Sequence, residues 1–412
     1  MKYGCIGEHL SHSFSKEIHN ELCDYEYEIV EIPRDELSDF AIKRDFIAIN
    51  VTIPYKELIM PYMHYIDSHA KQIGAVNTVV NKDGKLYGYN TDFYGMCALL
   101  EHAKIDVRDK KVLILGTGGT SKTSAAVVKA LGACEIIKVS RTPGAEAVTY
   151  DEAYMKHSDA EIIINTTPVG MFPNIYKSPI DLAHFKSLRG VVDAIYNPLR
   201  SELVMDATDR GIAATGGLYM LVAQAKRASE IFINRSHADS ELDRVYSKIL
   251  RSKKNIVLSG MPGCGKSTVG KMLADTLSRE LIDTDELIVA KAGMPIKDIF
   301  DKFGETYFRN IELEVIKEAS SRTGAIISTG GGAVLREENV WKLKKNGRIY
   351  FIDRPLNSLI PTDDRPLSST AEAIEKRYNE RYSVYTATAD VIIDADCDAA
   401  CVARKIQGEF GL

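Results

Sequence analysis

The sequence lacks the basic excess with which nucleic-acid-binding proteins neutralise phosphates. Its formal net charge is −5, and residues 1–250 carry 28 Lys and Arg against 33 Asp and Glu. The longest uncharged stretches, such as residues 211–225, contain Gly and Gln and are too short to span a membrane. The first five residues, Met1 to Cys5, lack the apolar core of a signal peptide. We therefore expect a cytoplasmic protein that binds neither nucleic acid nor membrane.

Cysteine is sparse, and histidine is confined to one part of the chain. The seven cysteines are scattered without paired spacing, and an odd number argues against a disulfide framework. We expect reduced thiols, with Cys397 and Cys401 too isolated for a zinc site. No histidine follows His237, which excludes imidazole catalysis and histidine metal ligands from the last part of the chain.

Two glycine-rich loops organise the 412 residues. The first, residues 116–119, lies between a strand-like apolar run at 112–115 and a helical pattern at 122–131. The second, residues 260–267, lies between a strand-like run at 255–258 and a helical pattern at 268–277. A strand, a phosphate loop and a helix begin an α/β nucleotide site. We predict two α/β nucleotide-binding units that meet near residue 251, with residues 252–254 as the linker.

The first loop, Gly116-Thr117-Gly118-Gly119, fits a dinucleotide site, because glycine lets a pyrophosphate approach the backbone at a helix N-terminus. The next predicted strand, Glu135–Val139, leads into Arg141, where an NAD site usually has an acidic residue for the ribose hydroxyls. Arg141 favours the 2′-phosphate of NADP; the alternative is a solvated surface arginine.

The residues before this loop contain four polar clusters, at 11–15, 50–56, 74–78 and 88–92. Each cluster alone could be a turn. Together they offer hydroxyls, amides, the ammonium of Lys56 and the carboxylate of Asp92. Such a set suits a small polyhydroxylated substrate and a proton-transfer pair for an alcohol.

Seven ordered segments of residues 1–250 resemble shikimate dehydrogenases. They are Ser13-x-Ser15, residues 50–56 and 74–79, Asn90-Thr91-Asp92, and residues 116–119, 165–171 and 216–224. The resemblance implies a substrate lobe, about residues 1–100 with helices at about 217–250, and a Rossmann NADP lobe at about 101–216. The implied reaction is the NADPH-dependent reduction of 3-dehydroshikimate to shikimate.

The resemblance also implies residue roles. Lys56 would be the general acid/base at the reacting oxygen, with Asp92 as its partner. Ser13, Ser15 and Tyr196 would hold the substrate carboxylate, and Thr52, Asn77, Asp92 and Gln224 its hydroxyls. NADP(H) would be bound by Gly116, Thr117, Gly118, Gly119, Thr120, Ser140, Arg141, Thr142 and Gly217.

The second loop, Gly260-Met261-Pro262-Gly263-Cys264-Gly265-Lys266-Ser267, matches Gly-x4-Gly-Lys-Ser/Thr in full. In such a loop backbone N–H groups cradle phosphate oxygens, Lys266 neutralises their charge and Ser267 binds Mg²⁺. We expect ATP to be bound by Gly263, Cys264, Gly265, Lys266, Ser267 and Thr268.

Carboxylates and arginines follow this loop. Asp283-Thr284-Asp285 comes after a predicted strand, which predicts two carboxylates on one side of an extended chain. Arg309 and Glu312 are expected on one helix face, and three glycines, 330–332, follow the predicted strand 325–328. Several arginines around a phosphate loop suit an acceptor that carries a carboxylate.

Residues 253–412 resemble shikimate kinase, a P-loop α/β/α domain, and we place this domain at 251–412. The resemblance assigns Asp283 to the Mg²⁺ shell, and Asp285 to the substrate hydroxyls and as a base. Arg309, Arg381 and the Gly331 backbone would hold the shikimate carboxylate. Arg365 would bind ATP and the transferring phosphoryl group.

The two resemblances together predict a bifunctional enzyme that makes shikimate and then phosphorylates it with ATP. Two alternatives remain at this stage. One is a quinate/shikimate dehydrogenase fused to a small-molecule kinase, and the other is a non-catalytic regulator that senses shikimate.

Overall fold

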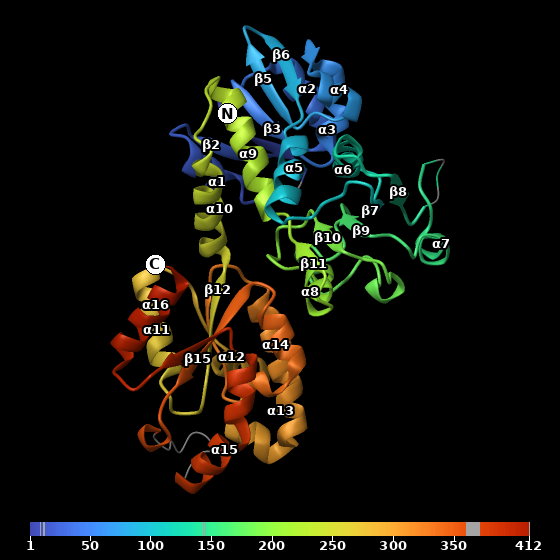
Figure 1. The fold of residues 1–412 in the computed structure, drawn as a ribbon. Coiled ribbons are helices and arrows are strands. Elements are labelled where there is room, and N and C mark those ends of the chain that lie inside the picture. Colours follow the sequence, from blue (N-terminus) through green and yellow to red (C-terminus); the bar gives the residue numbers. More distant parts are fainter. Residues whose placement is uncertain (9, 11–12, 143, 145, 360–370, 412) are drawn as a thin grey trace. The chain divides into compact units, whose positions relative to one another are not determined.

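The computed structural model describes residues 1–8, 10, 13–142, 144, 146–359 and 371–411. They form two compact units, Met1–Leu250 and Arg251–Leu412 (Figure 1). Within the described residues, no helix combines the length and the apolar character that crossing a bilayer requires.

The first unit opens with a six-stranded sheet in the order β2-β1-β3-β5-β6-β4. Strands β1, β2 and β3 pair in parallel, whereas β5 is antiparallel to β3 and β6. The strands are β1 (Tyr3–Gly7), β2 (Tyr27–Glu31), β3 (Ala48–Val51), β4 (Tyr65–Ile66), β5 (Thr78–Lys82) and β6 (Lys85–Tyr89). The helices around this sheet are α1 (Ser15–Leu22), α2 (Leu37–Lys43), α3 (Tyr55–Leu58) and α4 (Ser68–Ile73). The sheet carries the 50–56 cluster at the carboxyl end of its buried strand β3.

A parallel five-stranded sheet in the order β11-β10-β9-β7-β8 follows. It contains β7 (Lys111–Leu115), β8 (Glu135–Val139), β9 (Ile162–Asn165), β10 (Gly190–Asp193) and β11 (Ala213–Thr215), with helices α6 (Gly119–Ala130), α7 (Tyr150–Lys156) and α8 (Glu202–Asp209). The predicted strands at 112–115 and 135–139 are confirmed, and α6 begins three residues before the predicted start. The strand order reverses between β7 and β9, and a ligand crevice forms outside the carboxyl ends of such a pair.

Helices α5 (Asp92–His102) and α9 (Leu218–Ile233) pack against each other and connect the two sheets of the first unit. A single hydrophobic core joins them to α1 and to one face of β7, through side chains such as Ile18, Met96, Val112 and Val222. Two functional candidates lie on these helices, since Asp92 begins α5 and Gln224 belongs to α9.

The second unit is built on a parallel sheet in the order β13-β14-β12-β15-β16, as expected for an α/β nucleotide-binding domain. Its strands are β12 (Asn255–Ser259), β13 (Leu281–Asp283), β14 (Ile326–Ser328), β15 (Gly347–Asp353) and β16 (Val391–Asp394). Its helices are α11 (Lys266–Leu277), α12 (Thr284–Ala292), α13 (Ile296–Ser320), α14 (Glu337–Leu343), α15 (Ala371–Thr388) and α16 (Ala399–Phe410). The phosphate loop follows the central strand β12, so its neighbours β14 and β15 end on either side of it.

The predicted linker is wrong, because helix α10 (Ser240–Lys253) runs through Ser252 and Lys253. Lysine and arginine favour a helix, and Arg251 and Lys253 sit in its last turn, where positive charge complements the helix dipole.

The expectation that all cysteines are reduced is also wrong. Cys397 and Cys401 form a disulfide, with their Cα atoms 6.1 Å apart. Asp398 caps α16 by accepting a hydrogen bond from the Cys401 N–H at 2.7 Å, and this turn brings the two cysteines together. A spacing of four residues therefore permits pairing where a helix starts between the two cysteines.

Candidate active sites

A lysine–aspartate pair lies at the centre of the first unit. After β3 the chain turns, with the Tyr55 N–H donating to the Thr52 carbonyl at 2.8 Å, and enters the short helix α3 that carries Lys56. Lys56 Nζ lies 2.6 Å from Asp92 Oδ2. The side chains are 13% and 2% exposed, so this ion pair is largely shielded from water.

Asn77 links this pair to Gln224. Its amide nitrogen donates to Asp92 Oδ1 at 2.9 Å and to Gln224 Oε1 at 3.3 Å. The side-chain oxygen of Asn77, Oδ1, accepts from the Thr91 N–H at 2.8 Å and from the Thr78 hydroxyl at 3.0 Å. These contacts fix which end of the amide faces Asp92. The structure thus brings together the four predicted residues Lys56, Asp92, Asn77 and Gln224, from four segments of the chain.

The hydroxyl-bearing loop before α1 lies beside Tyr196. Ser13 and Ser15 are joined by a 3.0 Å bond between their hydroxyls, and the Phe14 ring packs against Tyr196 with 5.1 Å between ring centres. Burial raises the pKa of Tyr196 to about 12, opposed by a hydrogen bond from Ser13. The structure therefore brings these three hydroxyl groups together, as the sequence suggested.

The glycine loop after β7 closely approaches two other site segments. Gly116 has a φ of 107°, and a Cβ there would lie 2.8 Å from Thr166 Oγ1 on the loop after β9. A Cβ at Gly119 would lie 3.6 Å from Lys56 Cδ. The N-terminus of α6 and the lysine–aspartate pair therefore face the same space. Gly217 caps α9, and a Cβ there would collide with the Ala194 carbonyl.

Arg141 is exposed on the loop after β8. Ser140 Oγ accepts a hydrogen bond from the Thr142 N–H at 3.3 Å, which shapes this turn. Burial raises the pKa of Tyr150, and the positive charge of Arg141 opposes that rise. Thr117 is exposed in the glycine loop, and the half-buried Thr120 lies in the first turn of α6.

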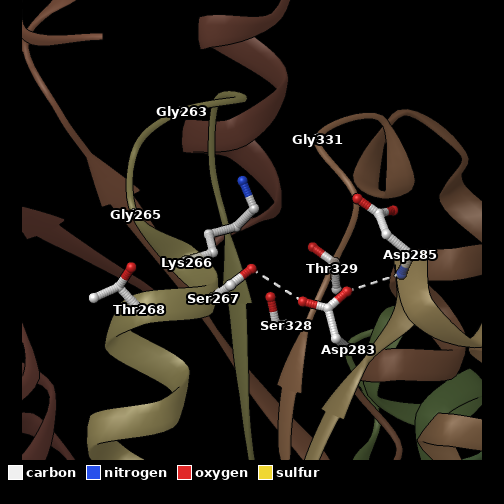
Figure 2. Close-up of a pocket in the computed structure, with 10 residues that line it drawn as sticks. All are labelled: Gly263, Gly265, Lys266, Ser267, Thr268, Asp283, Asp285, Ser328, Thr329 and Gly331. Atoms are coloured by element: carbon white, nitrogen blue, oxygen red, sulfur yellow. Dashed lines mark hydrogen bonds between the residues drawn. The ribbon is translucent and has the colours of Figure 1, made fainter. Parts of the chain in front are cut away.

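The second unit contains a pocket around its phosphate loop (Figure 2). It is lined by Gly263, Gly265, Lys266, Ser267, Thr268, Asp283, Asp285, Ser328, Thr329 and Gly331. Gly263 and Gly265 have φ of 81° and 98°, a conformation that favours glycine and that turns the loop into α11. Lys266 Nζ donates to the carbonyls of Gly260 at 2.8 Å and Met261 at 3.0 Å. Cys264 is buried, with its sulfur 3.7 Å from Lys266 Nζ.

The prediction of an extended Asp283-Thr284-Asp285 segment is wrong. Asp283 ends β13 and caps α12, accepting from the Asp285 N–H at 3.0 Å, so Asp285 lies in the first helical turn. The Ser267 hydroxyl donates to the other Asp283 oxygen at 3.0 Å. Asp283 therefore faces the phosphate loop, and Asp285 points toward Gly331 (Figure 2). Aspartate commonly ends a strand and caps a helix, which explains the difference.

Two of the arginines predicted to bind a carboxylate lie beside the triple-glycine segment, Arg309 at Gly332 and Arg381 at Gly331. Arg309 on α13 pairs with Glu312 at 2.8 Å and with Glu305 at 3.1 Å, which confirms the predicted helix face. Burial raises the pKa of Glu312, and the positive charge of Arg309 opposes the rise. Arg381 on α15 donates to the Gly331 carbonyl at 3.3 Å. Arg365 lies outside the described residues.

Sequence reasoning assigned no role to two buried polar residues of the first unit, although one of them, Asn165, begins the matched segment 165–171. Asp193 ends β10 with none of its surface exposed, and Asn165 ends β9 and donates to it at 3.0 Å. The available signal was an acidic residue after the apolar run 190–192, three residues before Tyr196.

Comparison with known proteins follows the division into two units. The family model of the shikimate dehydrogenase substrate binding domain matches residues 5–79, and that of shikimate kinase matches residues 262–409. The shikimate dehydrogenase (NADP(+)) of Clostridium beijerinckii is 37% identical over 245 residues, which are 56% of this chain and 91% of that protein. The chain belongs to the shikimate dehydrogenase family.

Solved structures of this family match the same part of the chain. Shikimate dehydrogenase 1 of Peptoclostridium difficile is 35% identical, with a TM-score of 0.57, over 60% of this chain and 98% of that one. The Thermus thermophilus shikimate 5-dehydrogenase, solved with NADP(H) and shikimate, is 26% identical, with a TM-score of 0.54 over 60% of this chain and 99% of that one. With its shikimate kinase domain, this member of the dehydrogenase family is a bifunctional enzyme of the shikimate pathway.

Proposed function

We propose that residues 1–250 reduce 3-dehydroshikimate to shikimate with NADPH, and that residues 251–412 transfer the γ-phosphoryl group of ATP to the shikimate 3-hydroxyl. The observation that carries the first part is the position of Lys56. Its ammonium pairs with Asp92 while its aliphatic stem lies against Gly119 of the dinucleotide loop. Reduction of a ketone needs this juxtaposition, because the hydride goes to the carbonyl carbon and the proton goes to the oxygen bound to it.

The substrate carboxylate is bound by Ser13, Ser15 and Tyr196 in this proposal. These groups offer three hydroxyl donors, and an ionised carboxylate accepts hydrogen bonds on both of its oxygens. Thr52, Asn77, Asp92 and Gln224 bind the ring hydroxyls. Because Asp92 accepts from Asn77 and Lys56 at once, a hydroxyl placed between them meets both a donor and an acceptor.

Bound NADPH supplies the hydride. Reduction of the ketone leaves negative charge on its oxygen, and Lys56 delivers the proton from Nζ. Asp92 holds the ammonium at that oxygen and balances the charge of the protonated lysine. In the reverse direction, Lys56 takes the proton from the shikimate hydroxyl.

The NADP-binding assignment rests on the open α6 N-terminus and on Arg141. A Cβ at Gly118 would meet no atom within 4 Å, so space for a pyrophosphate lies against the loop. Gly116, Thr117, Gly119 and Thr120 complete that cradle, and the turn Ser140, Arg141 and Thr142 presents a guanidinium and hydroxyls to a 2′-phosphate. Gly217 lets the backbone pass Ala194 beside the crevice.

In the kinase unit, Gly263 to Thr268 bind the phosphates of ATP, and Lys266 neutralises the charge that moves during transfer. The residues fit Mg²⁺, because the Ser267 hydroxyl and the Asp283 carboxylate supply two hard oxygen donors 3.0 Å apart. Phosphate oxygens and water would complete the coordination of such an ion, because Mg²⁺ at phosphate sites usually binds only one or two protein groups.

Asp285 accepts the proton of the attacking 3-hydroxyl. Arg309, Arg381 and the Gly331 backbone hold the acceptor carboxylate, and Arg365 steadies the transferring phosphoryl group. Positioning and charge neutralisation then supply most of the rate enhancement.

The full-length protein tests this proposal in two assays on one preparation. We expect shikimate-dependent reduction of NADP⁺ and shikimate-dependent release of ADP from ATP with Mg²⁺. Quinate with NAD⁺ serves as the competing substrate pair in the first assay. A preference for that pair would replace the proposed dehydrogenase reaction, and binding of shikimate without either turnover would identify a sensor instead.

A further inference from the structure

Asp193 is a fully buried carboxylate between the two loops that frame the dehydrogenase crevice. It ends β10, and its Oδ1 accepts from Asn165 Nδ2 and from the Ile195 N–H, both at 3.0 Å. Its Oδ2 accepts from the Ser201 hydroxyl at 2.5 Å. Both carboxylate oxygens are therefore engaged by groups from three different segments.

The Asn165 bond extends the network to the loop after β9. Asn165 Oδ1 accepts from the Thr167 N–H at 3.0 Å and from the Thr167 hydroxyl at 2.7 Å. The neighbouring Thr166 lies against Gly116 of the dinucleotide loop. Through Asn165, Asp193 thus determines how the 166–172 loop approaches the cofactor side of the crevice.

The Ile195 and Ser201 bonds control the loop after β10. The Ile195 N–H immediately precedes Tyr196, whose ring packs on Phe14 beside the serine pair. Ser201 Oγ accepts from the Val204 N–H at 3.4 Å and caps α8, so the far end of the same loop is held as well. The Phe172 N–H donates to the Asn197 carbonyl at 3.0 Å, which joins the two loops directly.

We propose that Asp193 is a positioning residue of the dehydrogenase, which holds the 166–172 loop and the Tyr196 loop in one arrangement so that cofactor and substrate meet. The inference rests on the proposed function of the first unit. Asp193 itself has no exposed surface and contacts no reactant. Its effect passes through Asn165 to the cofactor side and through Ile195 to Tyr196.

The chemistry of the network makes this positioning sensitive to pH. Burial raises the pKa of Asp193 to about 7, and the three donors from Ser201, Ile195 and Asn165 oppose the rise. The groups that face it are a hydroxyl, a backbone N–H and an amide, all uncharged at any working pH. As the pH falls through about 7, the carboxyl gains a proton and can no longer accept from all three donors.

Substitution separates positioning from simple stability. Asp193→Ala removes every bond, whereas Asp193→Asn keeps an acceptor for Asn165 and Ile195 and offers an N–H to Ser201. We expect Asp193→Ala to raise KM for shikimate and for NADP⁺ by about tenfold each, because a displaced loop costs each reactant about one hydrogen bond, which is worth about that factor. Asp193→Asn mimics the protonated carboxyl, so both of its KM values should match those of wild type at low pH. The kinase activity of the same chain should be unchanged in both variants.

The pH profile gives a readout that a structural role would not move. In wild type, KM for shikimate should rise as the pH falls below about 7, and this rise should be absent in Asp193→Asn. Ser201→Ala removes one donor to the carboxylate of Asp193 and so raises the pKa of Asp193 further. In this variant the rise in KM for shikimate should therefore begin at a higher pH than in wild type. If Asp193→Ala does not fold, this comparison of Ser201→Ala with Asp193→Asn carries the test. The matched control is Asp181→Ala. This substitution removes an exposed carboxylate that accepts a hydrogen bond from the Ala183 N–H, and it should change neither KM.

Unchanged KM values in Asp193→Ala, or the same pH dependence in Asp193→Asn as in wild type, would overturn the inference. The proposed function fails in a different way, because wild type itself would then show no shikimate-dependent NADP⁺ reduction.

Discussion

Lys56 Nζ and Asp92 Oδ2 lie 2.6 Å apart, in the part of the first unit where the dinucleotide loop approaches the substrate lobe. Asp92→Asn keeps the shape and the oxygen that accepts from Asn77, but it removes the negative charge next to the ammonium. We expect kcat for shikimate oxidation to fall about 10²-fold or more, in the range of a lost acid–base function. Steady-state rates of NADP⁺ reduction measure it.

Lys226 and Glu230 provide a matched control. Their ion pair is also short, at 2.8 Å, and the side chains are 5% and 10% exposed. Glu230→Gln should lower thermal stability with little change in kcat. An equal loss of kcat in both variants would show that any buried lysine pair, and not the one at the crevice, supports activity.

Arg141 should decide between the two dinucleotides. Arg141→Ala removes a charge-assisted bond to the 2′-phosphate, and such bonds are worth about 1.5–3 kcal/mol. We expect KM for NADP⁺ to rise about tenfold or more, with KM for NAD⁺ unchanged. Arg189, an exposed arginine paired with Glu161, is the control position. Equal KM changes for both dinucleotides would show that Arg141 does not recognise the phosphate.

The two carboxylates of the kinase pocket should respond differently to magnesium. Asp283 faces Ser267 of the phosphate loop, whereas Asp285 points toward Gly331 (Figure 2). We expect Asp283→Asn to raise the Mg²⁺ concentration needed for half-maximal activity, with recovery in excess Mg²⁺. Asp285→Asn should lose about 10²-fold or more of kcat at every Mg²⁺ concentration. Rescue of Asp285→Asn by Mg²⁺ would contradict these roles.

The Arg309–Glu312 pair predicts a pH-dependent stability defect. Arg309→Ala leaves the buried Glu312 without its cation, and breaking such a pair costs about 3–5 kcal/mol. Burial raises the pKa of Glu312 in the folded state, and loss of the opposing arginine raises it further. The unfolded state therefore releases its proton first, and the variant loses stability relative to wild type as the pH rises from acid to neutral.

Thermal unfolding of the second unit at pH 5 and pH 8 checks this sign. The difference in Tm between wild type and Arg309→Ala should be larger at pH 8. Lys376→Ala, which breaks an exposed pair with Glu380 of about 4.0 Å, should shift Tm little at either pH. A defect that is larger at pH 5 would contradict the assignment.

Local sequence patterns predicted the central strands and the glycine loops that follow them. Strands β7 and β12 are apolar runs because central parallel strands are buried on both faces, and the glycine loops follow them directly. The ends of helices and strands were harder to predict from the sequence. Ser252 and Lys253 were predicted as part of a linker, yet α10 continues through both, and Arg251 and Lys253 favour the helix by propensity and by their charge in its last turn.

Resemblance nominated residues that lie together in each unit, such as Lys56 with Asp92 and Arg381 with Gly331. The contacts that hold these residues in place could not be predicted from the sequence. The contact between Asp193 and Asn165 depends on the pairing of β9 with β10, which brings residues 28 positions apart beside each other. Cys397 and Cys401 likewise pair only because a helix starts between them.

The most direct test of two separate active sites in one chain is a reciprocal measurement of both activities in two variants. Lys56→Ala should lose shikimate-dependent NADP⁺ reduction and keep shikimate-dependent ADP release, and Lys266→Ala should show the opposite pattern. If either substitution abolished both activities in a folded chain, or if neither changed the activity assigned to it, the account would be contradicted.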